Sequence, residues 1–142
     1  MSHGHKVKSR EIGMLRIYLK PGERRAARGF KARLTTKPLY KELIEAARQD
    51  GIINAVAHHT HYGYSNHGTV EAANPEIQNP ALTMCVELIG AQVELDLFCR
   101  KHGALLQNKV IVYKHIEHWE INAHEVAKTD APIEELLDEE AT

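Results

Sequence analysis

Apolar residues recur at every second position in two segments of the chain, Met14–Lys20 and Ala81–Ile89. A period of two is typical of a β-strand that buries one face. Branched apolar residues predict a further strand over 52–62, and a fourth strand is predicted to start at Lys109 and to extend toward Trp119. We therefore expect four strands.

Two segments between these strands carry apolar residues at the spacing of an amphipathic helix. The first has Thr36 or Lys37 as its candidate N-cap and a proline in its first turn, and Gly51 favours its end. The second lies between Gly90 and Gly103. The order β-α-β-β-α-β predicts an α+β, ferredoxin-like sandwich, in which two helices cover one face of a four-stranded antiparallel sheet.

Two helices leave the second face of such a sheet uncovered. The residues expected there are large or apolar, which favours self-association of the chain through this face. The candidates are Tyr18, Cys85, Ile111 and Tyr113.

The length of the chain indicates one packed domain with a polar segment at each end. It has 142 residues, 43% of them hydrophobic, which is enough for a single core. We expect a flexible leader over 1–13, the folded domain over 14–121 and an acidic tail over 122–142. A formal net charge of -1 argues against non-specific binding of nucleic acid. No run of residues has the form of a membrane span or signal peptide, so we expect a cytoplasmic protein.

No motif of a common enzyme class is present in the sequence. A phosphate-binding loop and a dinucleotide-binding glycine pattern are both missing, so we do not expect catalysis. Cys85 and Cys99 lack the spacing of a zinc or redox pair and are expected to be reduced core residues. Trp119 and the tyrosines do not alternate with basic residues, which argues against an RNA-recognition module.

A histidine-rich segment leads from the second predicted strand into a long polar loop. His59 and His61 would share one face of a strand and, with His67 or a carboxylate, could chelate a divalent metal. Two other interpretations stay open: the histidines lie on a surface or interface without a ligand, or they contact a nucleotide or another anion.

Three short stretches resemble the small bacterial branch of the PII-like signalling proteins, which includes carboxysome-associated members. They are Met14-Leu15-Arg16-Ile17-Tyr18, Lys37-Pro38-Leu39-Tyr40 and Tyr62-Gly63-Tyr64-Ser65. The resemblance implies a homotrimer with adenine-nucleotide sites in the clefts between subunits. It also implies a non-catalytic protein that signals to a partner through a flexible loop, the T-loop, here about 64–80.

The resemblance also assigns roles to single residues. Gly63, Tyr64 and Ser65 stand where the family has Gly-Phe-Gly at the base of the T-loop, close to the nucleotide, with Tyr64 as the candidate for the base. Serine in place of the second glycine makes a positive φ less accessible at Ser65. Lys109 stands where PII proteins have a phosphate-binding lysine.

Arginines that PII proteins carry on the last strand are missing here. Glu117, Glu120 and Asn122 occupy that stretch, and carboxylates repel a triphosphate, so AMP or ADP is favoured over ATP. Candidates to replace these missing cations are Arg24, Arg25, Lys114 and His115. Asn66 and Glu87 are further candidates for contact with the nucleotide.

The carboxysome-associated branch suggests bicarbonate as a second ligand. The regulated partner would then be an inorganic-carbon transporter, or else another membrane transporter or an enzyme. Because copper-tolerance proteins of the CutA type use the same fold, a metal-binding protein with His59 and His61 as ligands is the alternative.

Overall fold

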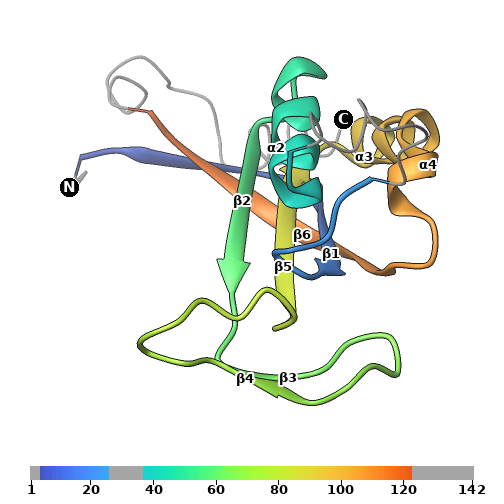
Figure 1. The fold of residues 1–142 in the computed structure, drawn as a ribbon. Coiled ribbons are helices and arrows are strands. Elements are labelled where there is room, and N and C mark those ends of the chain that lie inside the picture. The colour runs from blue at the N-terminus through green and yellow to red at the C-terminus, as the bar shows by residue number, and fades with distance from the viewer. Residues whose placement is uncertain (1–3, 26–36, 123–142) are drawn as a thin grey trace. The chain divides into compact units, whose positions relative to one another are not determined.

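The computed structural model describes residues 4–25 and 37–122. The chain divides into two compact units. One unit is Gly13–Lys114, and the other combines the residues up to Ile12 with those from His115 onward. Each unit is described by itself (Figure 1). No helix in the described ranges is long and apolar enough to cross a membrane.

A four-stranded sheet has the order β2-β5-β1-β6. Both β1 and β2 run antiparallel to the central strand β5, with Ile17 and Ala57 opposite Val86 from either side. The strands are β1 (Lys6–Leu19), β2 (Asn54–His59), β5 (Met84–Gly90) and β6 (Val110–Asn122). The predicted α+β architecture with a four-stranded sheet is confirmed, whereas the trimer stays a prediction.

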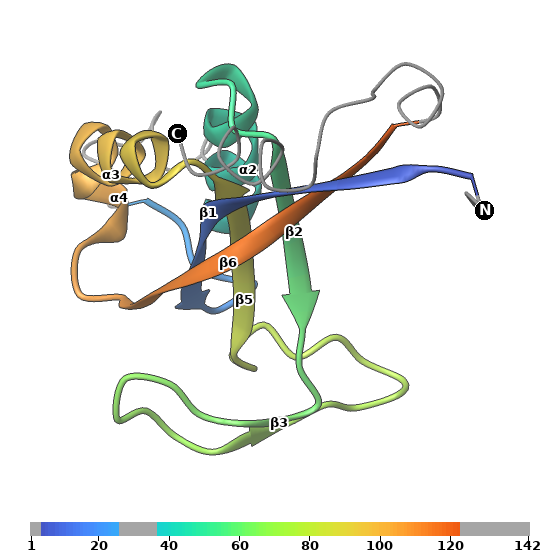
Figure 2. The ribbon, with the colours of Figure 1, turned by 180° about the vertical axis from the view of Figure 1, so that it is seen from behind.

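Within the described residues, three helices pack on one face of this sheet: α2 (Leu39–Gln49), α3 (Gln92–Lys101) and the short α4 (Gly103–Leu106) (Figure 2). Every second residue of β1 and β5 points into the core beneath them, as the alternation predicts. Burial of these side chains supplies the main stabilisation of the fold. The most buried ones are Ile17, Leu39, Leu43, Met84, Val86, Leu88, Leu95 and Phe98.

Tyr18 and Cys85 face each other on the side of the sheet away from the helices, as predicted. The prediction was wrong for Tyr113, which packs against the core beneath the helices. Its ring lies across Gly13, where an added Cβ would come within 2.5 Å of the Tyr113 Cε2 atom. Ile111 lies two positions away on the same strand and therefore faces the same side as Tyr113.

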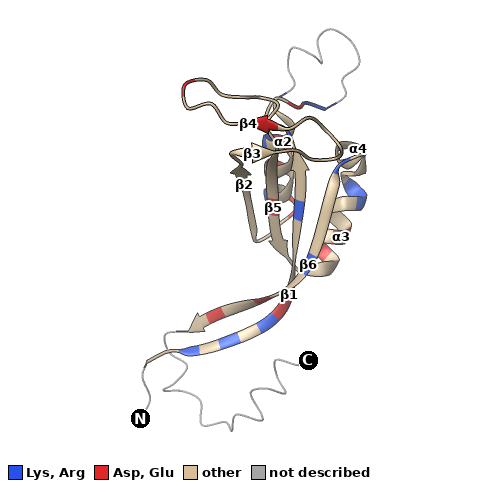
Figure 3. Cartoon of the chain, turned by 90° about the horizontal axis from the view of Figure 1, so that it is seen from below, with Lys and Arg blue, Asp and Glu red and all other residues tan. Residues whose placement is uncertain are grey.

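Two strand boundaries differ from the prediction. β1 begins at Lys6 rather than Met14, so most of the predicted leader is strand, and β6 continues to Asn122. These outer halves are polar and show no alternating apolar pattern, so the sequence signal for a strand is weak there. In Figure 3, basic positions predominate on the outer half of β1, which also carries the acidic Glu11, and the outer half of β6 has acidic positions. The predicted tail, from 123 onward, lies outside the described residues.

The long loop after β2 is not structureless. It contains a two-stranded hairpin, β3 (Tyr62–Gly63) paired with β4 (Glu71–Ala72). β2 itself ends at His59, three residues before the predicted end.

The first helix ends as predicted but starts without a side-chain cap. Pro38 is its N-cap residue, and Thr36 lies outside the described residues. Gly51 has a φ of +81°, a conformation that favours glycine, directly after the C-cap residue Asp50.

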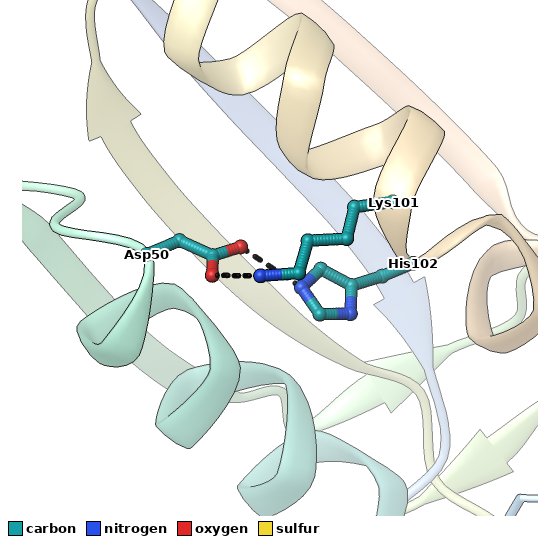
Figure 4. Close-up of polar contacts among 3 residues, drawn as sticks. All are labelled: Asp50, Lys101 and His102. Carbon is teal, nitrogen blue, oxygen red and sulfur yellow. Dashed lines mark hydrogen bonds and ion pairs between the residues drawn. The ribbon is translucent and has the colours of Figure 1, made fainter.

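An ionic cluster joins the ends of α2 and α3 (Figure 4). Lys101 Nζ lies 2.7 Å from one oxygen of the Asp50 carboxylate, and His102 Nε2 lies 2.9 Å from the other. The hydrogen bonds from Lys101 and then His102 lower the pKa of the Asp50 carboxyl below its ordinary value of 3.8. Ionised Asp50 therefore stabilises the folded state above about pH 4, and this contribution is lost as the pH falls through the lowered pKa.

We expect Asp50→Asn to lower the melting temperature by about 2–5 °C at pH 7, because the substitution removes the charge that both partners bind. The difference from the wild type should shrink as the pH falls from 5 to 3, as measured by circular dichroism. Asp96→Asn is the matched control, since Asp96 forms an exposed ion pair with Arg100 one turn away on α3. A difference that stays constant down to pH 3 would contradict the lowered pKa.

Candidate functional site

A cleft of about 570 Å³ lies within the unit Gly13–Lys114. Four segments that are distant in sequence form its wall: the end of β1 with the following turn, the T-loop base, the approach to β5, and the turn before β6. The residues that line it are Tyr18, Leu19, Lys20, Gly22, Glu23, Ser65, Asn66, Gly68, Pro80, Ala81, Thr83, Asn108 and Lys109.

The base of the long loop after β2, the predicted T-loop, enters this cleft as a tight turn over 65–68. The Gly68 N–H donates to the Ser65 carbonyl at 3.1 Å, and the two residues between them, Asn66 and His67, have φ values of +53° and +58°. Positive φ at both central positions is typical of a type I′ turn. The sequence analysis considered a positive φ at Ser65, whereas the residues with positive φ are the next two, Asn66 and His67.

A side-chain hydrogen bond connects this turn to the segment before β6. Asn66 Nδ2 donates to the Asn108 carbonyl at 2.7 Å, and Asn108 is itself left-handed, with a φ of +62°. Asparagine tolerates this conformation better than most residues. The bond holds Ser65 and Asn66 on the same cleft as Lys109.

Lys109 is the most enclosed cation of the cleft. Its side chain is 14% exposed, and its Nζ lies 2.7 Å from Oε1 of Glu23, whose side chain is 32% exposed. An ion pair this short between partly buried groups is a charge-assisted hydrogen bond. The candidate phosphate-binding group is thus held by a carboxylate of the same chain.

A second, more open hollow borders the first. It measures about 460 Å³ and is lined by Tyr64 and His67 together with Tyr18, Ser65 and Asn66, which also line the cleft, and by Val110. The Tyr64 side chain is 61% exposed beside it. An exposed aromatic ring next to a polar cleft can stack on a planar ligand.

The structure therefore brings together four of the predicted site residues, Tyr64, Ser65, Asn66 and Lys109. Gly63 adjoins them in β3, with a φ of +151° that favours glycine. Their role in binding a nucleotide stays a prediction.

Three other predicted residues do not line the cleft in the described part of the chain. Arg24 forms an isolated β-bridge with Pro38, and Arg25 is ion-paired with Glu42 of α2. Glu87 lies on the face of the sheet away from the described helices, where its carboxylate is 2.7 Å from His58 Nε2 and 3.9 Å from Arg16. The Glu87 carboxylate is thus paired with residues of both neighbouring strands.

The predicted substitute cations on β6, Lys114 and His115, are not lining residues of the cleft. His115 Nδ1 lies 3.0 Å from Glu11 in the other unit. Glu117 and Glu120, on which the preference against ATP depended, belong to that unit too.

The histidines do not form the predicted metal site. His59 ends β2, so His61 lies beyond the strand, and both line a separate hollow with residues of the loop that include Ala73, Asn74 and Ile77. His67 lines the hollow beside Tyr64 instead. Within residues 4–25 and 37–122, no group of three or more His, Cys, Asp or Glu residues could hold a metal ion.

Sequence reasoning missed Glu23, Asn108 and Thr83. Glu23 follows a Pro-Gly turn, and Asn108 directly precedes the candidate lysine. Their positions in turns are the one sequence signal that could have indicated Glu23 and Asn108, because turn residues near a strand end are common at binding sites. Thr83 is buried, and its carbonyl accepts a hydrogen bond from the Thr60 hydroxyl.

Comparison with known proteins identifies a family and a fold. The model of the DUF190 family, described as an uncharacterized ACR, matches residues 13–118. None of the curated proteins matches the chain. The apo form of CPII from Thiomonas intermedia K12, a nitrogen regulatory PII-like protein, is 8% identical, with a TM-score of 0.50. That match covers 81% of this chain and 99% of CPII, and it shows a PII-like fold.

Two further structures are similar at lower scores. CPII bound to ADP and bicarbonate has 9% identity and a TM-score of 0.47, and the match covers 82% of this chain and 92% of that chain. A putative PII-like signaling protein from Thermus thermophilus has 10% identity and a TM-score of 0.48, covering 80% and 92% respectively.

We expect Asn66→Ala to loosen the T-loop base, because it removes the hydrogen bond to Asn108 and places a less tolerant residue at positive φ. Each loss is worth about 1 kcal/mol, so hydrogen exchange at 65–68 and 108–109 should accelerate roughly tenfold or more. Exchange measured by mass spectrometry in the core strands should not change. Asn74→Ala, which removes a bond to the Glu76 N–H within the loop, is the control. Equal protection in both variants would mean that the bond does not hold the turn.

Proposed function

Because this chain belongs to the DUF190 family and has a PII-like fold, we propose that it is a non-catalytic regulatory protein that binds an adenine nucleotide. The observation that carries the proposal is the convergence of Ser65, Asn66 and Lys109 on one cleft. The T-loop base and the candidate phosphate lysine are about 40 residues apart in sequence, and the Asn66–Asn108 hydrogen bond brings them together.

The proposed roles follow from the chemistry of each group. Lys109 binds the phosphate, because an enclosed ammonium group forms strong hydrogen bonds with anionic oxygens. Tyr64 contacts the base through its exposed ring, and the backbone of Gly63 and Ser65 contacts the ribose or phosphate. The cleft of about 570 Å³ falls in the usual range of small-molecule sites.

We propose AMP or ADP as the ligand rather than ATP. Within the described residues, the lining of the cleft includes two lysines, Lys20 and Lys109, and one glutamate, Glu23. Two lysines and one glutamate amount to a formal charge of only one positive unit, which suits one or two phosphates better than three.

The proposed assembly is a homotrimer with the nucleotide between subunits. Its support is the PII-like resemblance together with the sheet face that carries Tyr18, Val56 and Glu87, which lies away from the described helices. Burial of this face against other copies would remove exposed apolar surface, such as that of Val56, from water.

Ligand binding is proposed to change the T-loop that begins at the cleft. A ligand that contacts Tyr64 and Ser65 favours the loop conformations in which both reach it, and so alters the surface offered to a partner. An inorganic-carbon transporter as that partner, or another transporter or enzyme, and bicarbonate as co-ligand, rest on the resemblance alone.

Lys109→Ala should weaken AMP and ADP binding by roughly tenfold or more, since a hydrogen bond to a charged group contributes about 1.5–3 kcal/mol. Isothermal titration calorimetry measures this directly, and circular dichroism confirms that the variant folds. Lys41→Ala, on the exposed side of α2, is the matched control and should bind as the wild type does. An unchanged affinity in Lys109→Ala would remove Lys109 from the site.

The double variant His59→Ala with His61→Ala should keep its nucleotide affinity within about threefold, less than 1 kcal/mol, because both side chains line a different hollow. The same titrations with Zn²⁺ test the metal alternative. Zinc binding by the wild type that disappears in the double variant would support the alternative over the present proposal.

A further inference from the structure

We propose that Glu23 is a specificity-determining residue, whose carboxylate takes the place of a ligand phosphate on Lys109 and penalises each additional phosphate that a nucleotide carries. This inference rests on the proposed function and deepens it. It concerns a residue that neither the sequence pattern nor the PII-like resemblance indicated.

Both oxygens of the Glu23 carboxylate have partners in the cleft. Oε1 lies 2.7 Å from Lys109 Nζ, and Oε2 accepts the backbone N–H of Lys20 at 3.2 Å. Two oxygens of a phosphate group could accept hydrogen bonds from the same two donors, an ammonium group and a backbone N–H. Glu23 therefore already makes the contacts that an incoming phosphate needs.

The backbone holds this carboxylate in position. The Glu23 N–H donates to the Lys20 carbonyl at 3.0 Å, and the Glu23 carbonyl accepts the Leu39 N–H at 2.7 Å. One residue earlier, the Gly22 N–H donates to the Pro80 carbonyl at 3.0 Å, and a Cβ at Gly22 would lie 2.9 Å from Pro80 Cβ. A carboxylate on such an anchored turn competes as an intramolecular group, at a high effective concentration.

Exchange of the carboxylate for a phosphate is sterically feasible. The Glu23 side chain is 32% exposed, so it can rotate toward water, where a released carboxylate is well solvated. Lys109 is 14% exposed and has less freedom to follow it. Ligand binding would thus replace one anion on Lys109 by another, and the displaced charge would remain close to the ligand.

The displaced charge is what gives selectivity. A phosphate monoester carries about two negative charges at pH 7, and each further phosphate of a nucleotide adds about one. Repulsion from Glu23 rises with each added charge, and so does the demand on the two cleft lysines. The expected order of affinity is AMP, then ADP, then ATP, while an uncharged nucleoside is indifferent to Glu23.

The test compares the wild type with Glu23→Gln by calorimetry against adenosine, AMP, ADP and ATP at fixed ionic strength. Glutamine keeps the length of the side chain but not its charge. We expect tighter binding of AMP by about threefold and of ATP by roughly tenfold or more, with ADP between them and adenosine within about twofold. Glu45→Gln is the matched control. It removes the same charge from α2, where Glu45 forms an exposed ion pair with Lys37, and it should leave the affinity for every nucleotide unchanged.

The outcomes separate the two proposals. Nucleotide binding by the wild type with no gain, or with a loss, in Glu23→Gln overturns the role of Glu23 and leaves the proposed function standing. Failure of both proteins to bind any of the nucleotides overturns both. If Glu23→Gln does not fold, the wild type still decides, because ATP binding more tightly than AMP would contradict the inference.

Discussion

The antiparallel register between β1 and β5 is the constraint from which the rest of the structure follows. Ile17 lies opposite Val86 and Leu19 opposite Met84, and all four side chains point toward the helices. A slip of β1 by one residue would turn Ile17 and Leu19 to the other face. The same register places the end of β1 beside the segment that leads into β5, so Lys20, Gly22 and Pro80 meet at one edge of the cleft.

The opposite edge of the cleft depends on backbone conformations that few residues adopt readily. Asn66, His67 and Asn108 all have positive φ, and one hydrogen bond joins the two turns that contain them. Unfavourable backbone geometry that persists at a cleft is common where a protein binds ligands, because the turn must present its N–H groups and side chains in fixed directions. The cleft thus lies between the end of β1 and two hydrogen-bonded turns, and Lys109 follows directly on one of these turns.

Charge in the cleft is balanced within the chain. The pairing of Lys109 with Glu23 satisfies both groups when no ligand is bound, which avoids an enclosed, unpaired ammonium group. The Arg16–Glu87–His58 cluster on the uncovered sheet face follows the same logic, with three strands contributing one member each. Glu87 and Arg25, which sequence reasoning assigned to a ligand, are likewise ion-paired with neighbours from the same chain.

The sequence by itself determined the order of elements and the buried face of the sheet, because alternation in β1 and β5 and the helical spacing in α2 are local signals that core burial enforces. It also indicated the T-loop base and Lys109 as parts of one site, through the PII-like resemblance. Only the tertiary structure decided that Tyr113 packs beneath the helices, that His59 and His61 lie apart from His67, and that Glu23 binds Lys109. These contacts join residues far apart in the chain, and a pairing of that kind leaves no periodic trace in the sequence.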